Sequence, residues 1–578
     1  MEHDLLFRKR HSLAHLLAMA ALEHDPLAKL SVGPVTENGF YYDIDFSERK
    51  TPSQDDLKTF EKSMRKIVNK KLAFTKRAVT AAKARETFAN NPYKLAIIDD
   101  IGQSGAPITF YDTGDFTDLC EGPHVGNTGE IDPKSFTLTH LAGAYWRGDE
   151  QNPMLTRIYG LAFDTEAELD AYLTQQEEAK KRDHRKLGRE LDLFTISELV
   201  GSGLPLFTPK GCFLRDTLSN YSQELQAKYG FERVWTPHMA RTELYKHSGH
   251  YDKYPERFEV TSAETDDVFM LKPMNCPHHA QLFARKPWSY RELPVRYMEN
   301  TTNYRDEKSG ELHGLSRVRS LSQDDGHVFC QEKDMETELR NIVLMIKELY
   351  ATLQLDFYAR LSFRDNSDKF LGDADTWKRA EAVITKVSSE ESLEAVIGPG
   401  EAAFYGPKID FMVRDSLGRE WQCATVQLDF VQPERFDLSY VDSDGTKKRP
   451  VMIHKALLGS IERFLSVYIE HTAGAFPFWL APVQVAILPV KENFSEYAEE
   501  INLTLKKLGY RTEMKMNETL GKRIRETKVE KIPYALVLGK QEMEARTVTL
   551  ESYAKGKVGV FSHEELLDIL ATDLREKR

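Results

Sequence analysis

The chain has 578 residues, of which 41% are hydrophobic and 29% charged, with a formal net charge of −12 and a pI of about 5.9. At roughly 100–200 residues per domain, this length predicts about three or four domains, each able to bury its own core. The acidic balance excludes binding to nucleic acid through overall charge, so such binding would need a local basic face.

The cysteines are scattered and odd in number, which argues against a disulfide framework and indicates a reducing compartment. They are Cys120, Cys212, Cys276, Cys330 and Cys423. The N-terminal FRKR is followed by only a short apolar run without a small-residue cleavage site, so no signal peptide is expected. The longest apolar stretch, residues 475–490, contains three prolines and is too short to span a bilayer. We expect a cytoplasmic protein that does not bind membranes.

Strand-like and helical patterns alternate in residues 1–180, which we expect to form the first domain. GFYYDIDF (39–46) and ITFYDTG (108–114) are typical of strands, and residues 56–72 are typical of a helix. A charged amphipathic stretch then predicts a linker helix, placed at residues 181–200, with its helical pattern ending near Gly188. Its basic residues face either solvent or phosphates. They are Lys180, Lys181, Arg182, Arg185 and Lys186.

Residues 201–476 are rich in β-type runs and are expected to form the second and largest domain. The runs are residues 233–240, 267–274, 294–307, 321–331, 409–415 and 419–431. They follow one another without regular alternation with helices, which favours an antiparallel sheet. A helical pattern covers residues 334–353. The predicted class of the whole chain is α+β with several domains.

Residues 477–578 follow a proline-rich stretch and are expected to form a small α/β domain. Four strand-like runs (483–490, 510–516, 534–539 and 545–553) alternate with helical patterns at 495–509, 520–531 and 564–578. The helix over 520–531 has a basic face that is either solvated or a contact to RNA. Its basic residues are Lys522, Arg523, Arg525 and Lys528.

Two short motifs, HSLAH and CEGPH, supply the candidate chemistry of the first domain. Histidines at i and i+4 lie on one helix face, and the Gly-Pro pair places the second motif on a turn. The four side chains could bind zinc or form a metal-free hydrolytic site in which imidazole is acid and base. HSLAH alone could also be a partly buried pair without chemistry. The four residues are His11, His15, Cys120 and His124.

The stretch LKPMNCPHH places Cys276 beside His278 and His279, but no second cysteine lies nearby. His327 and His454 lie far along the chain, and spacing alone does not indicate that they meet Cys276. One interpretation is a buried cysteine and two hydrogen-bonded histidines. The other is three protein ligands with an open position, as in a catalytic zinc site.

The sequence has neither a G-x-x-x-x-G-K-[ST] loop nor a G-x-G-x-x-G loop, so bound ATP would need another kind of phosphate ligand. Arginine is a candidate, because its guanidinium group matches phosphate oxygens bidentately. For each arginine taken singly, a surface ion pair is the favoured interpretation. The candidates are Arg305, Arg317, Arg319 and Arg463.

Six motifs of the middle segment resemble the threonyl-tRNA synthetases in sequence and order. They are LKPMNCPHH, YRDE, SQDDGHVF, FYGPKIDF, WQCATVQLDF and MIHKALLGSIERF. HSLAH, CEGPH and AGAYWRGD resemble the editing domain of the same family. The resemblance implies a class II antiparallel sheet flanked by helices over 201–476, an α+β editing domain over 1–180 and an α/β anticodon-binding domain over 477–578.

The resemblance also implies residue roles. Pro237 resembles the motif 1 proline at the dimer interface, so a homodimer is expected. One zinc per subunit would be bound by Cys276, His327 and His454. The residues expected around threonine are Met274, Gln323, Asp325, Tyr405, Gln422 and Gln427. Those expected to bind ATP, together with Mg²⁺, are Arg305 and Glu307 of motif 2, Arg317, and Arg463 of motif 3. Arg305, Arg463 and Gln427 are the expected catalytic residues.

The implied activity is the ATP-dependent formation of threonyl-adenylate and transfer of threonine to tRNA(Thr). Zinc would test for the β-hydroxyl group, which valine lacks. Serine has that hydroxyl and lacks only a methyl group, worth roughly 1–3 kcal/mol, so a second site that hydrolyses seryl-tRNA(Thr) is expected. The resemblance assigns it, without metal, to His11, His15, Lys94, Asp118, Cys120 and His124. The region of Glu542 is expected to contact the anticodon.

Three departures from the family pattern accompany the resemblance. The sequence begins ten residues before His11, so we expect a form without the family's small ubiquitin-like domain. His278 stands where the family more often has Gly, and Tyr304 before the motif 2 arginine is less usual. Two alternatives stay open: a metallohydrolase built on HSLAH and CEGPH, and an RNA-binding regulator that has lost catalysis.

Overall fold

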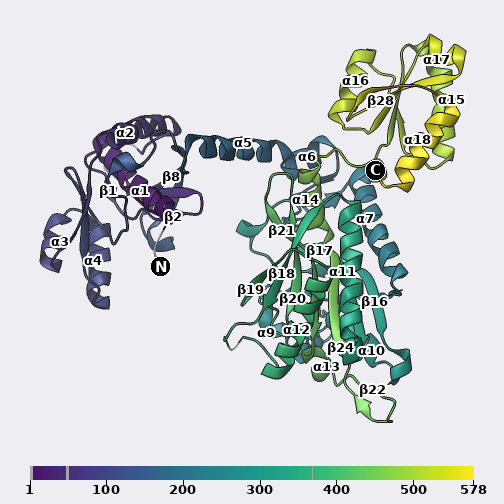
Figure 1. Cartoon of the computed structure of the whole chain (residues 1–578), viewed down its shortest axis with the longest axis horizontal. Coiled ribbons are helices and arrows are strands. Elements are labelled where there is room, and N and C mark those ends of the chain that lie inside the picture. The colour runs from purple at the N-terminus through teal and green to yellow at the C-terminus, as the bar shows by residue number, and fades with distance from the viewer. Residues whose placement is uncertain (1–3, 47–50, 368) are drawn as a thin grey trace. The chain divides into compact units, whose positions relative to one another are not determined.

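The computed structural model of the chain describes residues 4–46, 51–367 and 369–578 (Figure 1). These residues form two compact units that divide between residues 178 and 179. The division lies next to the expected end of the first domain at residue 180. Across the described ranges, no helix combines the length and the apolar composition needed to cross a membrane.

A five-stranded antiparallel sheet covered by two helices forms the main body of the N-terminal unit. Helix α1 (Leu5–His24) begins at Asp4, whose carboxylate accepts the N–H of Phe7. Together with α2 (Leu57–Asn69), it packs its apolar residues on the sheet. The strand order is β1-β3-β8-β7, and β2 pairs with β3. The strands are β1 (Lys29–Leu30), β2 (Val35–Thr36), β3 (Gly39–Asp45), β7 (Phe136–Tyr145) and β8 (Met154–Ala162).

A second, smaller antiparallel sheet of the order β4-β5-β6 completes this unit. Two helices accompany it, and α4 begins at Asn91, whose side chain accepts the N–H groups of Tyr93 and Lys94. This cap fixes Lys94 in the first turn of α4. The elements are β4 (Phe74–Ala78), α3 (Ala81–Thr87), α4 (Pro92–Ser104), β5 (Thr109–Thr113) and β6 (Phe116–Leu119).

The predicted linker helix at residues 181–200 needs correction. The structure has two helices, α5 (Glu166–Arg182) and α6 (His184–Glu190), separated by one residue. Asp183 causes the break, because its side chain accepts the N–H of Arg185 and begins a new helix within the charged run. After α6 the chain turns into the short strand β9 (Phe194–Thr195).

An eight-stranded sheet is the centre of the second unit (Figure 1). Its order is β11-β16-β17-β24-β21-β20-β18-β19, and every neighbouring pair is antiparallel except the two edge pairs. The antiparallel prediction is thus confirmed for the six central strands. The strands are β11 (Glu232–Arg233), β16 (Val295–Tyr304), β17 (Ser320–Cys330), β18 (Asp356–Phe363), β19 (Ala395–Pro399), β20 (Lys408–Arg414), β21 (Glu420–Asp429) and β24 (Val451–Ser460).

Helices α7, α11 and α14 pack on this sheet and share its main core. Helix α11 buries Leu339, Ile342, Val343, Ile346 and Leu349, a spacing that places one apolar stripe on the sheet. Each such side chain contributes roughly 1.5–3 kcal/mol on burial, so the core holds the strands in fixed register. The helices are α7 (Pro209–Lys228), α11 (Met335–Thr352), α12 (Ala374–Glu390) and α14 (Ile461–His471).

The predicted strand at residues 233–240 is wrong as a single element. Strand β11 ends at Arg233, and β12 begins only at Met239. Pro237 has no N–H for a ladder, and the N–H of Thr236 is bound by the Glu299 carboxylate instead. Strand β12 (Met239–Arg241) joins β13 (Glu259–Thr261) and β14 (Val268–Leu271) in a small sheet, which is followed by α10 (Cys276–Ala284).

The C-terminal segment has the predicted α/β pattern, with a sheet of the order β26-β25-β27-β28-β29. One expectation for it is wrong: Arg523 is buried and donates to the carbonyl oxygens of Pro489 and Lys515, so it is not part of a solvated basic face. The elements are β25 (Val485–Pro489), α15 (Ser495–Lys507), β26 (Thr512–Met514), α16 (Leu520–Val529), β27 (Tyr534–Leu538), α17 (Lys540–Ala545), β28 (Thr547–Ser552), β29 (Gly556–Ser562) and α18 (His563–Arg575).

Candidate active site

Cys276, His327 and His454 meet in the second unit, although they are far apart in sequence. His327 on β17 and His454 on β24 are partners across the two strands, with Nε2 of the first 2.9 Å from Nδ1 of the second. Cys276 opens helix α10, and one ligand atom from each of the three residues lies within 4.8 Å of the others. All three side chains are buried.

Neighbouring polar groups hold these imidazoles in place. Asp429 Oδ2 lies 2.7 Å from Nε2 of His454, and Nδ1 of His279 lies 2.8 Å from Nδ1 of His327. Burial, then the carboxylates of Asp325 and Asp429, raise the pKa of the Cys276 thiol well above its usual value. A bound cation would reverse that preference, since a coordinating thiol is deprotonated. One sulfur and two supported imidazole nitrogens fit a zinc site.

His278 and His279, the two histidines beside Cys276, have different surroundings. His279 contacts His327 and lies 3.3 Å from the Glu299 carboxylate, so it supports the cluster. Both ring nitrogens of the buried His278 have no hydrogen-bond partner among the residues described.

His250 belongs to this neighbourhood and was missed by the sequence analysis. Its Nε2 lies 3.4 Å from the sulfur of Cys276, and its Nδ1 lies 2.8 Å from the hydroxyl of Ser248. Burial lowers the pKa of His250 to about 3, so it is neutral at physiological pH. No spacing or motif in the sequence distinguished it from an ordinary buried histidine.

A cavity of about 610 Å³ opens in this unit. It contains six of the predicted site residues: Arg305, Glu307, Arg317, Gln323, Gln422 and Arg463. Cys423, Thr425, Gly459 and Ser460 complete part of its wall. The cavity contains three guanidinium groups, which can match phosphate oxygens bidentately, and two carboxylates, those of Glu307 and Glu311.

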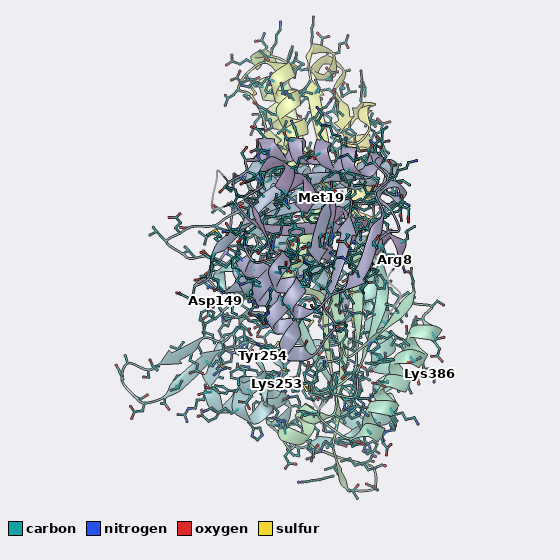
Figure 2. All side chains as sticks on the ribbon, turned by 90° about the vertical axis from the view of Figure 1, so that its left-hand side faces the viewer. Arg8, Met19, Asp149, Lys253, Tyr254 and Lys386 are labelled. Carbon is teal, nitrogen blue, oxygen red and sulfur yellow. The ribbon has the colours of Figure 1, made fainter. Side chains whose placement is uncertain are left out.

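Arg305 is held from two sides. Its Nη2 lies 3.3 Å from the sulfur of Met274, and its guanidinium group lies 5.4 Å from the centre of the Tyr254 ring. Tyr254 is labelled with its neighbour Lys253 in Figure 2. Nε of Arg305 is buried and has no hydrogen-bond partner within the described part of the chain. A buried donor without a partner in the chain indicates a site that is completed by something the chain does not supply.

Glu307 and Arg317 form an ion pair of 2.7 Å across the loop that follows β16. Arg317 also pairs with Glu311 at 2.7 Å. Arg319 donates to the backbone oxygen of Glu307 and does not line the cavity. Its contact therefore stabilises the loop and does not reach the cavity. Arg463 lies in the first turn of α14 and is exposed to the cavity.

The remaining predicted threonine residues lie toward the cysteine and histidine cluster. Asp325 Oδ2 is 3.9 Å from Nδ1 of His327. The Tyr405 hydroxyl donates to Oε1 of Gln427, and the Tyr405 ring centre is 5.0 Å from that of His454. Gln427 is the register partner of His454.

A charged network beneath Gln422 was also missed. Gln422 donates to Asp410 at 2.8 Å and accepts from Arg360 at 3.1 Å. Lys408 pairs with the same fully buried Asp410 at 2.7 Å. Lys408 and Asp410 lie in the FYGPKIDF motif and could have been found from it. Arg360 lies outside every motif named in the sequence.

The four predicted residues His11, His15, Cys120 and His124 of the N-terminal unit also meet. The sulfur of Cys120 lies 3.3 Å from Nε2 of both His11 and His124. Burial raises the pKa of the Cys120 thiol to about 11 and lowers the pKa values of His15 and His124 below the usual range. At pH 7 the Cys120 thiol and the imidazoles of His15 and His124 are therefore neutral.

Lys94 and Asp118 form a buried ion pair of 2.6 Å beside this cluster. The Tyr42 hydroxyl donates to Asp118 at 2.6 Å, and Nε2 of His15 lies 3.9 Å from the same carboxylate. All six residues that the resemblance assigned to the first domain therefore lie in one site.

Comparison with known protein families identifies three segments of the chain. Residues 257–472 match the tRNA synthetase class II core domain (G, H, P, S and T), and residues 484–573 match an anticodon binding domain. Residues 108–159 match the threonyl and alanyl tRNA synthetase second additional domain. Together with the antiparallel sheet and its arginine-lined cavity, these matches define a class II aminoacyl-tRNA synthetase.

Curated relatives narrow the class to one family. The chain is 47% identical to a threonine–tRNA ligase of Gloeobacter violaceus, covering all of this chain and 95% of the relative. It is 46% identical to one of Thermus thermophilus, covering all of this chain and 90% of the relative. The chain belongs to the threonine–tRNA ligase family.

Two solved structures are similar to this chain. One, described as the RNA binding domain of threonyl-tRNA synthetase from Cryptosporidium parvum, has a TM-score of 0.64 at 35% identity and covers 68% of this chain and 98% of its own. The other, a putative threonyl-tRNA synthetase from Aeropyrum pernix, has a TM-score of 0.60 at 28% identity, with coverages of 69% and 96%. The resemblance and the class II fold expected from the sequence are thus confirmed.

Proposed function

We propose that this chain is an ATP-dependent ligase that joins L-threonine to tRNA(Thr). The threonine carboxylate attacks the α-phosphorus of ATP and displaces pyrophosphate; a 3′-terminal hydroxyl group of the tRNA then attacks the adenylate and AMP leaves. The observation that carries this proposal lies along β17. Gln323 lines the cavity, and Asp325 and His327 follow at alternate positions, which face the same side of a strand.

We assign ATP binding to the arginines of the cavity. Arg305 holds the α-phosphate through its guanidinium group, and Arg463 holds the γ-phosphate. Arg317 lies near the triphosphate, and Glu307 contacts adenine. Mg²⁺ accompanies the nucleotide and neutralises phosphate charge. The residues accelerate the reaction by positioning the reactants and stabilising charge at the phosphorus.

We assign threonine to the region between the cavity and the buried cluster. Asp325 accepts from the ammonium or hydroxyl group of the amino acid, and the Tyr405–Gln427 pair closes one side of the pocket. Gln422 is held by Asp410 for contact with the substrate. Met274 and Gln323 complete the pocket, each in contact with a fixed polar neighbour, Arg305 and Asn303 respectively.

Zinc is the metal we assign to Cys276, His327 and His454, with one ion per subunit. A thiolate and two imidazoles form the protein part of a catalytic-type site, and Asp429 and His279 hold the rings. Held by these three residues, zinc would supply Lewis-acid chemistry toward the amino and β-hydroxyl groups of threonine. A site built for the hydroxyl rejects an isostere that lacks it.

Hydrolytic editing of seryl-tRNA(Thr) is the function we assign to the N-terminal unit, without a metal. The high pKa of Cys120 disfavours a thiolate nucleophile at neutral pH. We assign acceptance of the proton from attacking water to His11, which is only half-buried, whereas burial lowers the pKa of His124 and makes it a weak base. The Lys94–Asp118 pair fixes the charge around the ester. The four-ligand arrangement would also fit zinc, which makes metal content the deciding measurement.

We also propose the wider organisation that the family implies. Residues 1–180 edit, residues 201–476 catalyse ligation and residues 477–578 bind the anticodon, near Glu542. The protein acts as a cytoplasmic homodimer, with Pro237 at the interface. The nearby Trp235 supports this interface, because the residue is 74% exposed in the single subunit.

Threonine-dependent exchange of pyrophosphate into ATP tests the ligase proposal. The wild-type protein loaded with zinc should catalyse exchange, and Arg305→Ala and Arg463→Ala should each reduce it by roughly a hundredfold or more. Absence of exchange in the pure, zinc-loaded protein would refute the assignment and favour an RNA-binding regulator. Hydrolysis of seryl-tRNA(Thr) by the wild-type protein and its loss in His11→Ala test editing separately.

Metal content separates the two candidate metal centres. Cys276→Ser should lose the bound zinc, whereas His11→Ala should keep one ion per subunit. Retention of zinc by Cys276→Ser and its loss from His11→Ala would instead support a metallohydrolase in the N-terminal unit.

A further inference from the structure

His184 lies outside the cavity but joins three elements of the second unit. It is the first residue of α6, and only 1% of it is exposed. Its Nδ1 lies 2.6 Å from Oε1 of Glu470 on α14, and its backbone N–H donates to the same oxygen at 3.0 Å. The N–H of Leu315, in the loop between β16 and β17, donates to its Nε2 at 3.0 Å.

These contacts define the tautomer of His184. Nε2 accepts the N–H of Leu315, so in the neutral ring Nδ1 carries the proton and donates it to the Glu470 carboxylate. Both nitrogens are thereby satisfied, and one imidazole joins the loop to α14. Asn or Gln cannot reproduce two such contacts at this spacing.

Gly314 indicates that the loop is fitted to this imidazole. Its φ is +51°, and a Cβ added there would lie 2.1 Å from Nε2 of His184. The next residue, Leu315, is fully buried in the main core. A side chain at 314 would therefore have to displace either His184 or the loop.

The loop held in this way forms one wall of the cavity. His313, Ser316 and Arg317 line it on either side of the Gly314–Leu315 contact. Arg317 carries the ion pair with Glu307, the residue assigned to adenine. A shift at Leu315 would therefore move groups assigned to ATP.

Glu470, the partner of His184, is also connected to Trp421 in another wall of the cavity. Its second oxygen pairs with Arg419, which also binds Asp415 at 2.6 Å. Asp415 in turn accepts the indole N–H of Trp421 at 3.0 Å, and Trp421 lines the cavity. The His184–Glu470 pair thus stands behind two walls of one cavity.

We infer that His184 is a positioning residue for ATP, which sets the loop of residues 313–318 and, through Glu470, the Trp421 wall. This inference rests on the proposed ATP site. His184 does not line the cavity and contacts no assigned substrate residue, so it acts only through the groups that it holds.

The test compares KM values for ATP and threonine in pyrophosphate exchange for His184→Ala, Gly314→Ala and the double variant. Losing the partner of a buried N–H should raise KM for ATP roughly tenfold in His184→Ala, with KM for threonine changed by less than about twofold. Gly314→Ala should have an effect of similar size. Because both changes disturb one contact, the double variant should also stay near tenfold, not near the roughly hundredfold of independent effects.

Gly310→Ala is the matched control in the same loop, because a Cβ there would meet no atom within 4 Å; it should leave both KM values unchanged. If His184→Ala does not fold, the milder Glu470→Gln tests the same connection by removing the charge, and it should raise KM for ATP more than KM for threonine. Multiplicative effects in the double variant, or an unchanged KM for ATP in folded His184→Ala or in Glu470→Gln, would overturn the inference. Full exchange in Arg305→Ala would instead refute the proposed ATP site. Failure of the His184 inference and failure of the ATP site therefore give different results.

Discussion

The buried Lys94–Asp118 pair should be a main contributor to the stability of the N-terminal unit as well as to its chemistry. Each residue is at most 2% exposed, and the carboxylate also accepts from the Tyr42 hydroxyl and the N–H of Leu119. Asp118→Asn keeps the shape of the side chain but removes its charge. Lys94 is then left buried without a counter-charge, since its other contact is the hydroxyl of Tyr42.

Breaking a buried ion pair by removing one partner costs about 3–5 kcal/mol. For a unit of this size, 1 kcal/mol shifts the melting temperature by about 2–4 °C, so Asp118→Asn should lower it by about 6–20 °C. The double variant Lys94→Met/Asp118→Asn removes both charges and should recover much of the loss. Asp112→Asn is the matched control, because its pair with Arg77 lies on the same small sheet but is partly exposed, and it should cost at most about 1 kcal/mol.

Calorimetry of the full chain measures the transition of the N-terminal unit, and pyrophosphate exchange shows that the second unit stays intact. Asp118→Asn should lower the first transition, abolish hydrolysis of seryl-tRNA(Thr) and leave exchange unchanged. A melting temperature within about 1 °C of wild type would refute the argument that Lys94 depends on this carboxylate. An equal loss in the double variant would refute the part that assigns the cost to the unpaired charge.

Two further predictions concern other parts of the site. In Gly406→Ala, the new Cβ would lie 1.7 Å from the backbone oxygen of Leu428, so β21 must move beside Tyr405; we expect KM for threonine to rise roughly tenfold or more. Burial lowers the pKa values of His15 and His124, so the folded unit keeps both neutral while the unfolded chain takes up protons below about pH 6.5. Their contribution is fully present above that pH and is lost as the pH falls, so calorimetry should show the first transition declining from pH 7 to 5, and less steeply in His15→Gln.

The local elements of the fold were predictable because their patterns are short-range. HSLAH indicated one helix face, and α1 carries both histidines on it. The run around Gln323 and His327 indicated a strand, and β17 covers it. The linker was misjudged because a cap inside a charged run, Asp183, has the same composition as its surroundings. Residues 233–240 have the composition of a strand, but Pro237 has no N–H for a ladder and divides them into two short strands.

The assembly of the site could not be predicted from such patterns. The pairing of His327 with His454 is a matter of register between strands that are far apart in sequence, and no local signal fixes it. A register shift between Gln323 and Asp325 adds an irregularity that periodicity does not predict. Only the resemblance to a family brought these residues together in advance. The contacts of His184 and His250 could not be predicted, because each is a single residue whose role depends on neighbours that are distant in sequence.

The two sites proposed for amino-acid discrimination differ because the two competitors differ from threonine in opposite ways. Valine lacks a hydroxyl group, and a buried polar site that must be satisfied by that hydroxyl rejects it strongly. Serine satisfies every such polar contact and lacks only a methyl group. The loss of that group's packing discriminates against serine by only about 1–3 kcal/mol. No improvement of the Tyr405–Gln427 pocket removes that limit. A second, hydrolytic step is therefore part of our proposal, and we assign it to the His11–Cys120 cluster, which lies in a unit with its own core and its own buried ion pair.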